Sequence, residues 1–245
     1  MTSRRLAVAG VLVAALVAIG ARQVVTSADG AKPKAIPFDD ARLKIEYNST
    51  EGDAGLQFFI DAKGWRHVTV TNPLGRKVLD VDAAKVIRNY GLSELFSESS
   101  EPPFTEFPFA EFKKLFPEGV YTFEGQDIDG KPLRSTFNLA HNIPDGPTIT
   151  SPADGATFPA TDVDVTWQPV TTPAGIDIVA YEVFVVADDS GLGTAERTVD
   201  VTLPGTATHL AVPPEFLTPG GYKTDVIAID RGGNQTLAEV PFTVA

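Results

Sequence analysis

The chain has 245 residues, of which 43% are hydrophobic and 21% charged, so it is long enough for one large or two ordinary domains and too apolar to be disordered throughout. The absence of cysteine excludes disulfides, thiolate nucleophiles, thiolate metal sites and a lipid anchor on an acylated cysteine. The net charge is −12, and it is −15 for the 17 basic and 32 acidic residues that follow Ser27, which disfavours nucleic acid and anionic lipid as partners.

The N-terminus has the pattern of an export signal. Two arginines in Met1–Arg5 precede Leu6–Ala21, a run of sixteen residues that are all apolar or glycine. At about 1.5 Å per residue, a helix of this run falls short of a hydrocarbon core about 30 Å thick, which favours a signal peptide over residues 1–27. Thr26-Ser27-Ala28 and Ile19-Gly20-Ala21 are alternative cleavage sites, and neither is a full A-x-A motif. We therefore expect an exported protein that is periplasmic, extracellular or, if the signal is uncleaved, anchored at the membrane by this segment alone.

Residues 39–143 are predicted to form a first β-rich domain, after a linker over 28–38. Apolar and polar residues alternate in short segments that are separated by turn residues, which is the pattern of half-buried strands. The alternation places Trp65 on the face of its strand opposite to Val68 and Val70. The expected strands are Arg42–Tyr47, Gln57–Asp61, Trp65–Thr71, Val78–Val81, Val120–Glu124 and Leu133–His141.

A helical insertion interrupts this domain. Phenylalanines recur at helical spacing in Pro108–Phe116, where the first proline suits a helix start and Pro117 stops the helix. Val86–Phe96 fits either a short helix or a strand. With this insertion the domain resembles an immunoglobulin-like sandwich. The segments IEYNSTEGDAG, EPPF and FPEGVYTFEG also resemble a group of uncharacterised exported bacterial proteins, and that resemblance implies no mechanism.

Residues 147–245 are predicted to form a second domain after a junction at Asn142–Pro147. Short strands spaced about 8–12 residues apart are typical of a β-sandwich, and we expect this segment to fold alone. The expected strands are Thr148–Pro152, Asp162–Gln168, Ala180–Val186, Glu196–Leu203, Thr208–Val212, Lys223–Asp230 and Thr236–Val244.

The second domain resembles fibronectin type III domains. The resemblance is carried by Trp167, Tyr181 and the LTPGGY stretch at Leu217–Tyr222, although one residue fewer than usual separates the leucine from the tyrosine. It implies that Tyr222 forms a tyrosine corner, in which the hydroxyl bonds to nearby main chain. The predicted fold class is therefore all-β, with two tandem immunoglobulin-like or fibronectin type III-like β-sandwiches, the first with a short helical insertion. This fold hosts many functions and specifies none.

No catalytic or cofactor motif is present. The sequence lacks a nucleophile elbow, a phosphate loop and a dinucleotide fingerprint, and His67, His141 and His209 have no second ligand at metal-binding spacing. We therefore predict no catalytic residue, no cofactor and no metal site. Asn48-Ser49-Thr50 and Asn234-Gln235-Thr236 match the glycosylation sequon, which matters only in a eukaryotic source.

Calcium is the one cofactor for which the sequence offers candidate ligands, in its acidic turns. Asp127-Ile128-Asp129-Gly130 is a fragment of a calcium loop without the later glutamate, and a hairpin turn explains it better. Asp188-Asp189, or Glu51 with Asp53, would offer carboxylates at a domain end, and solvated turn residues again explain them better.

The tandem β-architecture without a catalytic motif predicts an exported, non-enzymatic binding or cell-envelope structural module with a protein or glycan partner. The alternative is a carbohydrate-binding accessory protein, for which Trp65, Tyr90 and Phe104 would be the aromatic platforms unless they lie in the core. A third hypothesis is a hydrolase with dispersed carboxylates. Its first candidates are Glu94, Glu98, Glu101 and Glu106.

A partner surface is predicted near the helical insertion. The stretch from Gly91 to Glu118 is far longer than the turns of about 2–5 residues that a sandwich needs, and it is rich in phenylalanine. Exposed aromatic rings rimmed by glutamates would form an interaction patch, whereas the alternative is that the rings plug an open end of the sandwich. The residues predicted for this surface are Phe104, Phe107, Phe109, Glu101 and Glu106.

Overall fold

The computed structural model describes residues 34–188 and 197–245, which belong to one compact unit, Pro33–Ala245. The predicted signal peptide over 1–27 and most of the Asp188–Gly193 loop lie outside the described residues. Within them the fold is mainly β, as the predicted fold class requires. No helix among the described residues is long and apolar enough to cross a membrane.

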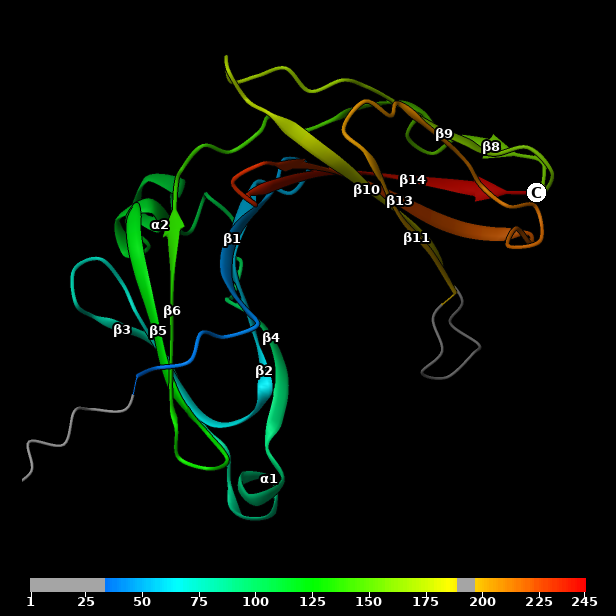
Figure 1. The fold of residues 1–245 in the computed structure, drawn as a ribbon. Helices are drawn as coiled ribbons and strands as arrows, with labels where there is room; N and C mark the ends of the chain where they lie inside the picture. The colour runs from blue at the N-terminus through cyan, green and yellow to red at the C-terminus, as the bar shows by residue number, and fades with distance from the viewer. Residues whose placement is uncertain (1–33, 189–196) are drawn as a thin grey trace, which may run out of the picture. The chain divides into compact units, whose positions relative to one another are not determined.

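The first half contains six strands and two helices among its described residues (Figure 1). They are β1 (Asp40–Asn48), β2 (Asp53–Thr71), β3 (Lys77–Asp82), α1 (Lys85–Tyr90), β4 (Leu92–Glu98), α2 (Phe109–Leu115), β5 (Gly119–Asp127) and β6 (Pro132–Leu139). The predicted insertion helix is confirmed as α2, and the ambiguous segment Val86–Phe96 contains both a helix and a strand. Strands β5 and β6 run side by side as the predicted hairpin.

The predicted linker over 28–38 ends earlier than expected. Ile36 forms a parallel bridge with Leu133, and its backbone N–H donates to the carbonyl of Pro132 at 2.9 Å. Phe38 is buried in the first hydrophobic core. The alternation rule missed this short segment because a single bridge has no period from which it could be recognised.

Strand β2 bends and pairs with four other strands. Its first part pairs with β1 and β4, its second part pairs with β3 and β5, and the register with β4 shifts between Asp61 and Trp65. A second shift lies between Trp65 and His67 in the pairing with β5. Because of these shifts, Trp65, Val68 and Val70 are all fully buried, so the prediction that Trp65 faces away from the two valines is wrong.

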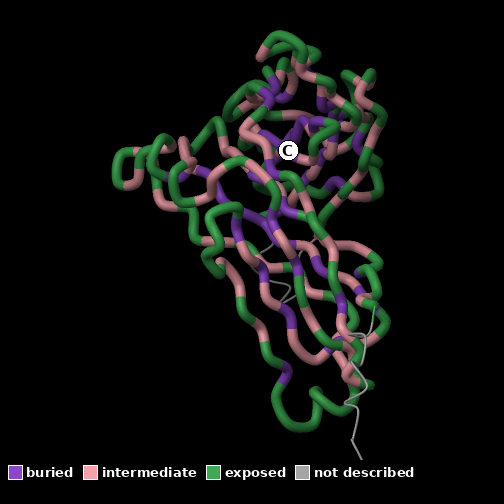
Figure 2. Tube along the Cα trace, turned by 60° about the vertical axis from the view of Figure 1, so that its left-hand side comes forward, coloured by how far each residue is buried: buried purple, intermediate pink, exposed green. Residues whose placement is uncertain are grey.

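The second half is a two-layer sandwich. One layer has the order β12-β9-β7 and the other the order β11-β10-β13-β14, an arrangement of the immunoglobulin and fibronectin type III kind. Figure 2 shows buried residues alternating with intermediate or exposed ones along the strands. The buried residues of this half form one core that includes Trp167 and Tyr181. The strands are β7 (Thr148–Ser151), β8 (Thr157–Phe158), β9 (Asp164–Gln168), β10 (Ile178–Ala187), β11 (Thr198–Pro204), β12 (His209–Ala211), β13 (Gly220–Asp230) and β14 (Gln235–Val244).

Both halves contain a tyrosine corner. The Tyr222 hydroxyl donates to the carbonyl of Thr218 at 2.9 Å and accepts from the Thr218 N–H at 2.8 Å, which confirms the predicted corner. The Tyr121 hydroxyl donates to the carbonyl of Pro117 at 3.0 Å, again four residues upstream. Each tyrosine leads into a strand that forms a hairpin with the next strand, so the two halves share this local design.

The two halves are joined by strand pairing. Strand β14 pairs with β13 on one side and, in parallel, with β1 on the other, which makes one eleven-stranded sheet among the described residues. The register sets Glu46 opposite Gln235 and Tyr47 opposite Thr236. Only three residue pairs make this contact, so side chains must contribute to it.

A buried polar segment of β14 and the turn before it supplies those contacts. The Asn234 amide accepts from the Ile45 N–H at 3.0 Å and donates to the carbonyls of Ala140 and Asn142 at 2.7 and 3.0 Å. The Thr236 hydroxyl donates to a carbonyl of the interdomain segment, and Asn234, Gln235 and Thr236 are each at most 2% exposed. The sequon at this position is therefore not accessible to a glycosyltransferase in the folded protein.

The Asn234 amide is expected to be essential for the junction. Asn234→Ala would leave the buried Ile45 N–H without its partner, at about 1–3 kcal/mol, and would remove the hydrogen bonds to two part-buried carbonyls, at about 0.5–1.5 kcal/mol each, so the free energy of unfolding should fall by about 2–5 kcal/mol. Urea unfolding measures this loss, and Asn138→Ala, an exposed asparagine on β6, is the control that should change stability by less than about 0.5 kcal/mol. A loss below about 1 kcal/mol for Asn234→Ala would contradict the role of this side chain.

A fragment of residues 147–245 tests whether the second core is sufficient. It keeps that core but loses β1, so three buried polar side chains of the junction become solvated. We expect the fragment to fold with a lower free energy of unfolding than the same half has in the whole chain, and Trp167→Ala to cost it about 3–5 kcal/mol more. Urea unfolding followed by circular dichroism gives both values; a fragment indifferent to Trp167→Ala would contradict the assigned core.

Candidate binding groove and acidic cluster

A groove of about 340 Å³ lies on the outward face of the shared sheet, where β1, β2 and β4 meet β10, β13 and β14. In β1, Leu43 and Ile45 point into the core, so Lys44 and Glu46 point outward into the groove. The alternation of β10 likewise turns Glu182 and Phe184 toward the groove. The groove therefore exists because two half-buried sheets continue into one another at the junction.

Aromatic rings form one wall of the groove. Phe59 of β2 and Phe96 of β4 are cross-strand neighbours with ring centroids 5.1 Å apart. Arg42 and Lys44 lie over the Phe59 ring at 4.5 and 4.9 Å, whereas Phe96 is 51% exposed. Phe184 of β10 lines the opposite wall. Phe96 is thus an open aromatic surface in a groove that also carries charged groups.

The charged groups of the groove are held by the junction. Lys44 donates to the Gln235 side-chain oxygen at 2.7 Å, and the amide nitrogen of Gln235 donates to Glu46. Burial lowers the pKa of Lys44 and raises that of Glu46, whose hydrogen bond from Gln235 acts in the opposite direction. Burial, followed by the charge of Asp200, also raises the pKa of Glu182. Three of the four ionisable residues that line the groove, Glu46, Glu182 and Asp225, are acidic, so the groove is predominantly acidic.

An acidic cluster adjoins the groove. The carboxylates of Glu46, Glu98 and Glu101 can place one oxygen each within 4.8 Å of one another. Glu98 lies opposite Gln57 in the pairing of β4 with β2 and accepts from its amide nitrogen at 2.6 Å. Glu101 lies over Gly55, where an added Cβ would be 2.4 Å from its carboxylate oxygen. The missing side chain of Gly55 is what admits the third carboxylate.

The pKa of Glu101 is raised to about 7. Burial is the main cause, and the neighbouring charges of Glu98, Glu46 and Asp53 act in the same direction. Each of these groups comes from a different strand, so the raised pKa results from the convergence of β1, β2 and β4.

The structure brings together two of the four carboxylates named for a hydrolase. Glu98 and Glu101 lie in the cluster, whereas Glu94 and Glu106 do not. Sequence reasoning missed Glu46: the alternation of β1 turns it outward, but only the pairing of β1 and β4 with opposite edges of the first part of β2 places it near Glu98.

The aromatic candidates have separate positions. Trp65 is fully buried and donates its indole N–H to the carbonyl of Ser93 at 3.1 Å, so it takes the core position that was the alternative to an exposed platform. Tyr90 is 84% exposed on α1, outside the groove. Phe59 and Phe96, which do line the groove, were missed because strand alternation alone does not show which outward face is concave.

The predicted partner surface is partly buried. The rings of Phe104 and Phe109 each lie 5.2 Å from that of Tyr47, and Phe107 lines an apolar groove of about 320 Å³ beside α2. Glu106 is exposed, and none of the three phenylalanines is fully buried. The partner surface stays a prediction.

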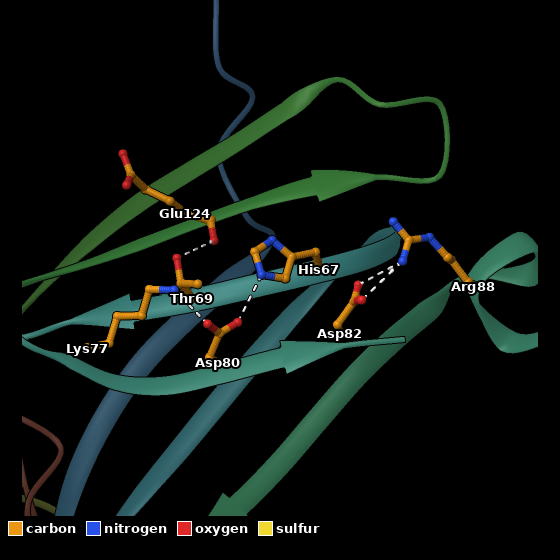
Figure 3. A network of polar contacts seen from close by, with 7 residues as sticks. All are labelled: His67, Thr69, Lys77, Asp80, Asp82, Arg88 and Glu124. Atoms are coloured by element: carbon orange, nitrogen blue, oxygen red, sulfur yellow. Dashed lines mark hydrogen bonds and ion pairs between the residues drawn. The ribbon is translucent and has the colours of Figure 1, made fainter. Parts of the chain in front are cut away.

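His67 lies in an exposed polar network on the β2–β3 hairpin (Figure 3). Its Nε2 is 2.9 Å from one oxygen of Asp80, whose other oxygen accepts from Lys77 at 2.6 Å. Arg88 pairs with Asp82 at 3.0 Å beside it. Hydrogen bonds from Lys77 and His67 lower the pKa of Asp80. These carboxylates have cationic partners, and exposed pairs of this kind contribute little to stability.

Two of the three turns weighed as calcium sites contain side-chain hydrogen bonds to their own backbone, and Asp189 of the third lies outside the described residues. Asp127 Oδ1 accepts from the N–H of Lys131 at 2.8 Å within the β5–β6 hairpin, so the predicted hairpin turn is confirmed. In the β1–β2 turn, Asn48 Oδ1 accepts from the Glu51 N–H at 2.9 Å.

Comparisons with known proteins add little. No protein-family model matches the sequence, and no curated protein matches it. Among solved structures, the FN1–FN3 domains of chicken CNTN1 are 10% identical, with 86% of this chain and 65% of that chain covered and a TM-score of 0.33. A tetra-tandem repeat in the extending region of a large adhesion protein is 15% identical, with 84% and 50% covered and a TM-score of 0.29. The chain thus spans under two thirds of either structure, and scores this low carry no argument about function.

Replacing the Glu101 carboxyl is expected to stabilise the protein at alkaline pH. A pKa raised from 4.5 to about 7 means that the folded state binds this proton more tightly, so the stabilisation is present below pH 4.5 and is lost as the pH rises through about 7. Glu101→Gln should therefore raise the melting temperature at pH 8 and change it little at pH 4. Thermal unfolding in EDTA measures this, with Glu94→Gln as the control; a gain at pH 4 as large as that at pH 8 would contradict the assignment.

Proposed function

We propose that this chain is an exported, non-enzymatic binding module that takes a neutral glycan in the groove of the shared sheet. The observation that carries the proposal is the half-exposed ring of Phe96 in a groove that also presents Lys44, Glu46 and Glu182. Sugars offer an apolar ring face and many hydroxyls, so an open aromatic ring beside hydrogen-bonding groups suits them. Export is supported by the basic and apolar pattern of the first 21 residues.

The position of the groove favours recognition by side chains. The strands that floor it, β2, β1, β14, β13 and β10, each have a hydrogen-bonded neighbour on both sides. An added peptide strand needs a free sheet edge, and among the groove strands only β4, which pairs with β2 alone among the described residues, offers one. The acidic lining and the net charge of −12 also disfavour phosphates and anionic polysaccharides.

Glycan binding is testable with matched aromatic variants. Calorimetric titration with neutral oligosaccharides of glucose, mannose and N-acetylglucosamine should detect binding by the purified protein, and heparin should not bind. Phe96→Ala should weaken binding about three- to tenfold, since it removes one stacking contact. Tyr90→Ala removes an exposed ring outside the groove and should bind like the wild type. Equal affinities for the two variants, or no binding of any neutral glycan, would contradict the proposal.

A hydrolase is the second candidate, favoured by the raised pKa of Glu101 beside the groove. The test is whether the protein releases reducing ends from the same oligosaccharides. An activity that Glu101→Gln abolishes would show that the protein is a hydrolase and would contradict the non-enzymatic proposal.

A further inference from the structure

The acidic cluster has the spacing of a hard cation site. Glu46 of β1, Glu98 of β4 and Glu101 just after β4 can bring one carboxylate oxygen each within 4.8 Å of the others. Ca²⁺ binds oxygen ligands at about 2.4 Å, so two oxygens on the same ion are at most about 4.8 Å apart. All three carboxylates can therefore bind one ion together.

Gln57 provides an independent observation. Its side chain is 5% exposed, and its amide lies at the cluster, donating to Glu98 at 2.6 Å and facing the Glu46 carboxylate. The other atom of that amide, Oε1, is buried without any hydrogen-bond partner among the described residues. Buried amide oxygens normally accept a hydrogen bond, and an amide oxygen is also a common Ca²⁺ ligand. The unpartnered oxygen and the three carboxylates need the same kind of partner.

The basic side chain whose charge acts on Glu46 is engaged elsewhere. Lys44, which approaches Glu46 along β1, donates to Gln235 and lies over the Phe59 ring. Its ammonium is therefore held on the groove side of the cluster, and like charges at such short range repel unless a cation lies between them.

We propose that Glu46, Gln57, Glu98 and Glu101 form a binding site for Ca²⁺. Carboxylate and amide oxygens in a partly exposed site, with room for water ligands, suit the variable coordination of Ca²⁺ better than the strict octahedron of Mg²⁺. Sites of this kind in extracellular modules have dissociation constants of about 10⁻⁴–10⁻³ M. The ion would tie β1, β2 and β4 to the chain that leads into α2, and this inference does not depend on glycan binding.

The test is calcium titration of the purified, EDTA-treated protein. Calorimetry with CaCl₂ should give one site with a dissociation constant of about 10⁻⁴–10⁻³ M. At about ten times that concentration and constant ionic strength, the melting temperature should rise by about 3–6 °C. Glu98→Gln should weaken binding at least about tenfold. Glu94 lies on the same face of β4, two alternate positions before Glu98, and Glu94→Gln should bind like the wild type.

Gly55→Ala separates ligand geometry from charge. The added Cβ would displace the Glu101 carboxylate, which is a flexible side-chain end, while every charge is retained. We expect weaker Ca²⁺ binding in this variant. Circular dichroism checks that the variant folds. If Gly55→Ala does not fold, Glu101→Gln is tested in its place.

Three results would overturn the site. They are a wild type whose melting temperature Ca²⁺ does not raise, equal losses of affinity in Glu94→Gln and Glu98→Gln, and Mg²⁺ binding as tight as Ca²⁺ binding.

Discussion

The parallel pairing of β14 with β1 is the contact on which the rest of the molecule depends. It covers the edge of the second sandwich and continues its sheet into the first, over only three residue pairs. Asn234, Gln235 and Thr236 complete it with hydrogen bonds to β1 and to the segment between the halves. A buried polar network is stabilising only when its members are satisfied, and the Asn234 amide meets that condition because its oxygen and nitrogen are both bonded. Without this contact the groove would have only one wall.

Gln235 links the junction to the chemistry of the groove. Its amide oxygen holds the ammonium of Lys44 and its amide nitrogen bonds Glu46, so one side chain positions a cation and an anion on the same face. Holding Lys44 toward β14 keeps it from neutralising the carboxylates beyond Glu46. The acidic cluster and the groove are therefore two consequences of one arrangement, although each would bind a different ligand.

Local periodicity was sufficient to predict most of the strands and α2, because each depends on neighbours in sequence. The corner at Tyr222 was implied by the resemblance to fibronectin type III domains. The corner at Tyr121 could have been found from FPEGVY, which spaces its tyrosine like LTPGGY. The junction could not be predicted: Asn234 follows a glycine turn and has the composition of a solvated loop, yet it is 1% exposed because of partners about 90 and 190 residues away. The acidic cluster could not be predicted for the same reason, since Glu46 meets Glu98 only because β1 and β4 pair with opposite edges of the same part of β2.

The register of the junction decides what the groove presents. Successive side chains of a strand face opposite sides, so Gln235 and Leu237 line the groove while the Thr236 hydroxyl reaches a backbone carbonyl behind it. A slip by one residue would exchange these faces, placing Thr236 in the groove and removing the partner of Lys44. With three residue pairs, backbone hydrogen bonds alone specify the register weakly. The buried amide of Asn234 adds that specificity, because its oxygen meets the Ile45 N–H only in the observed alignment. A polar residue in this core thus defines which groups face the ligand, and not only how strongly the halves adhere.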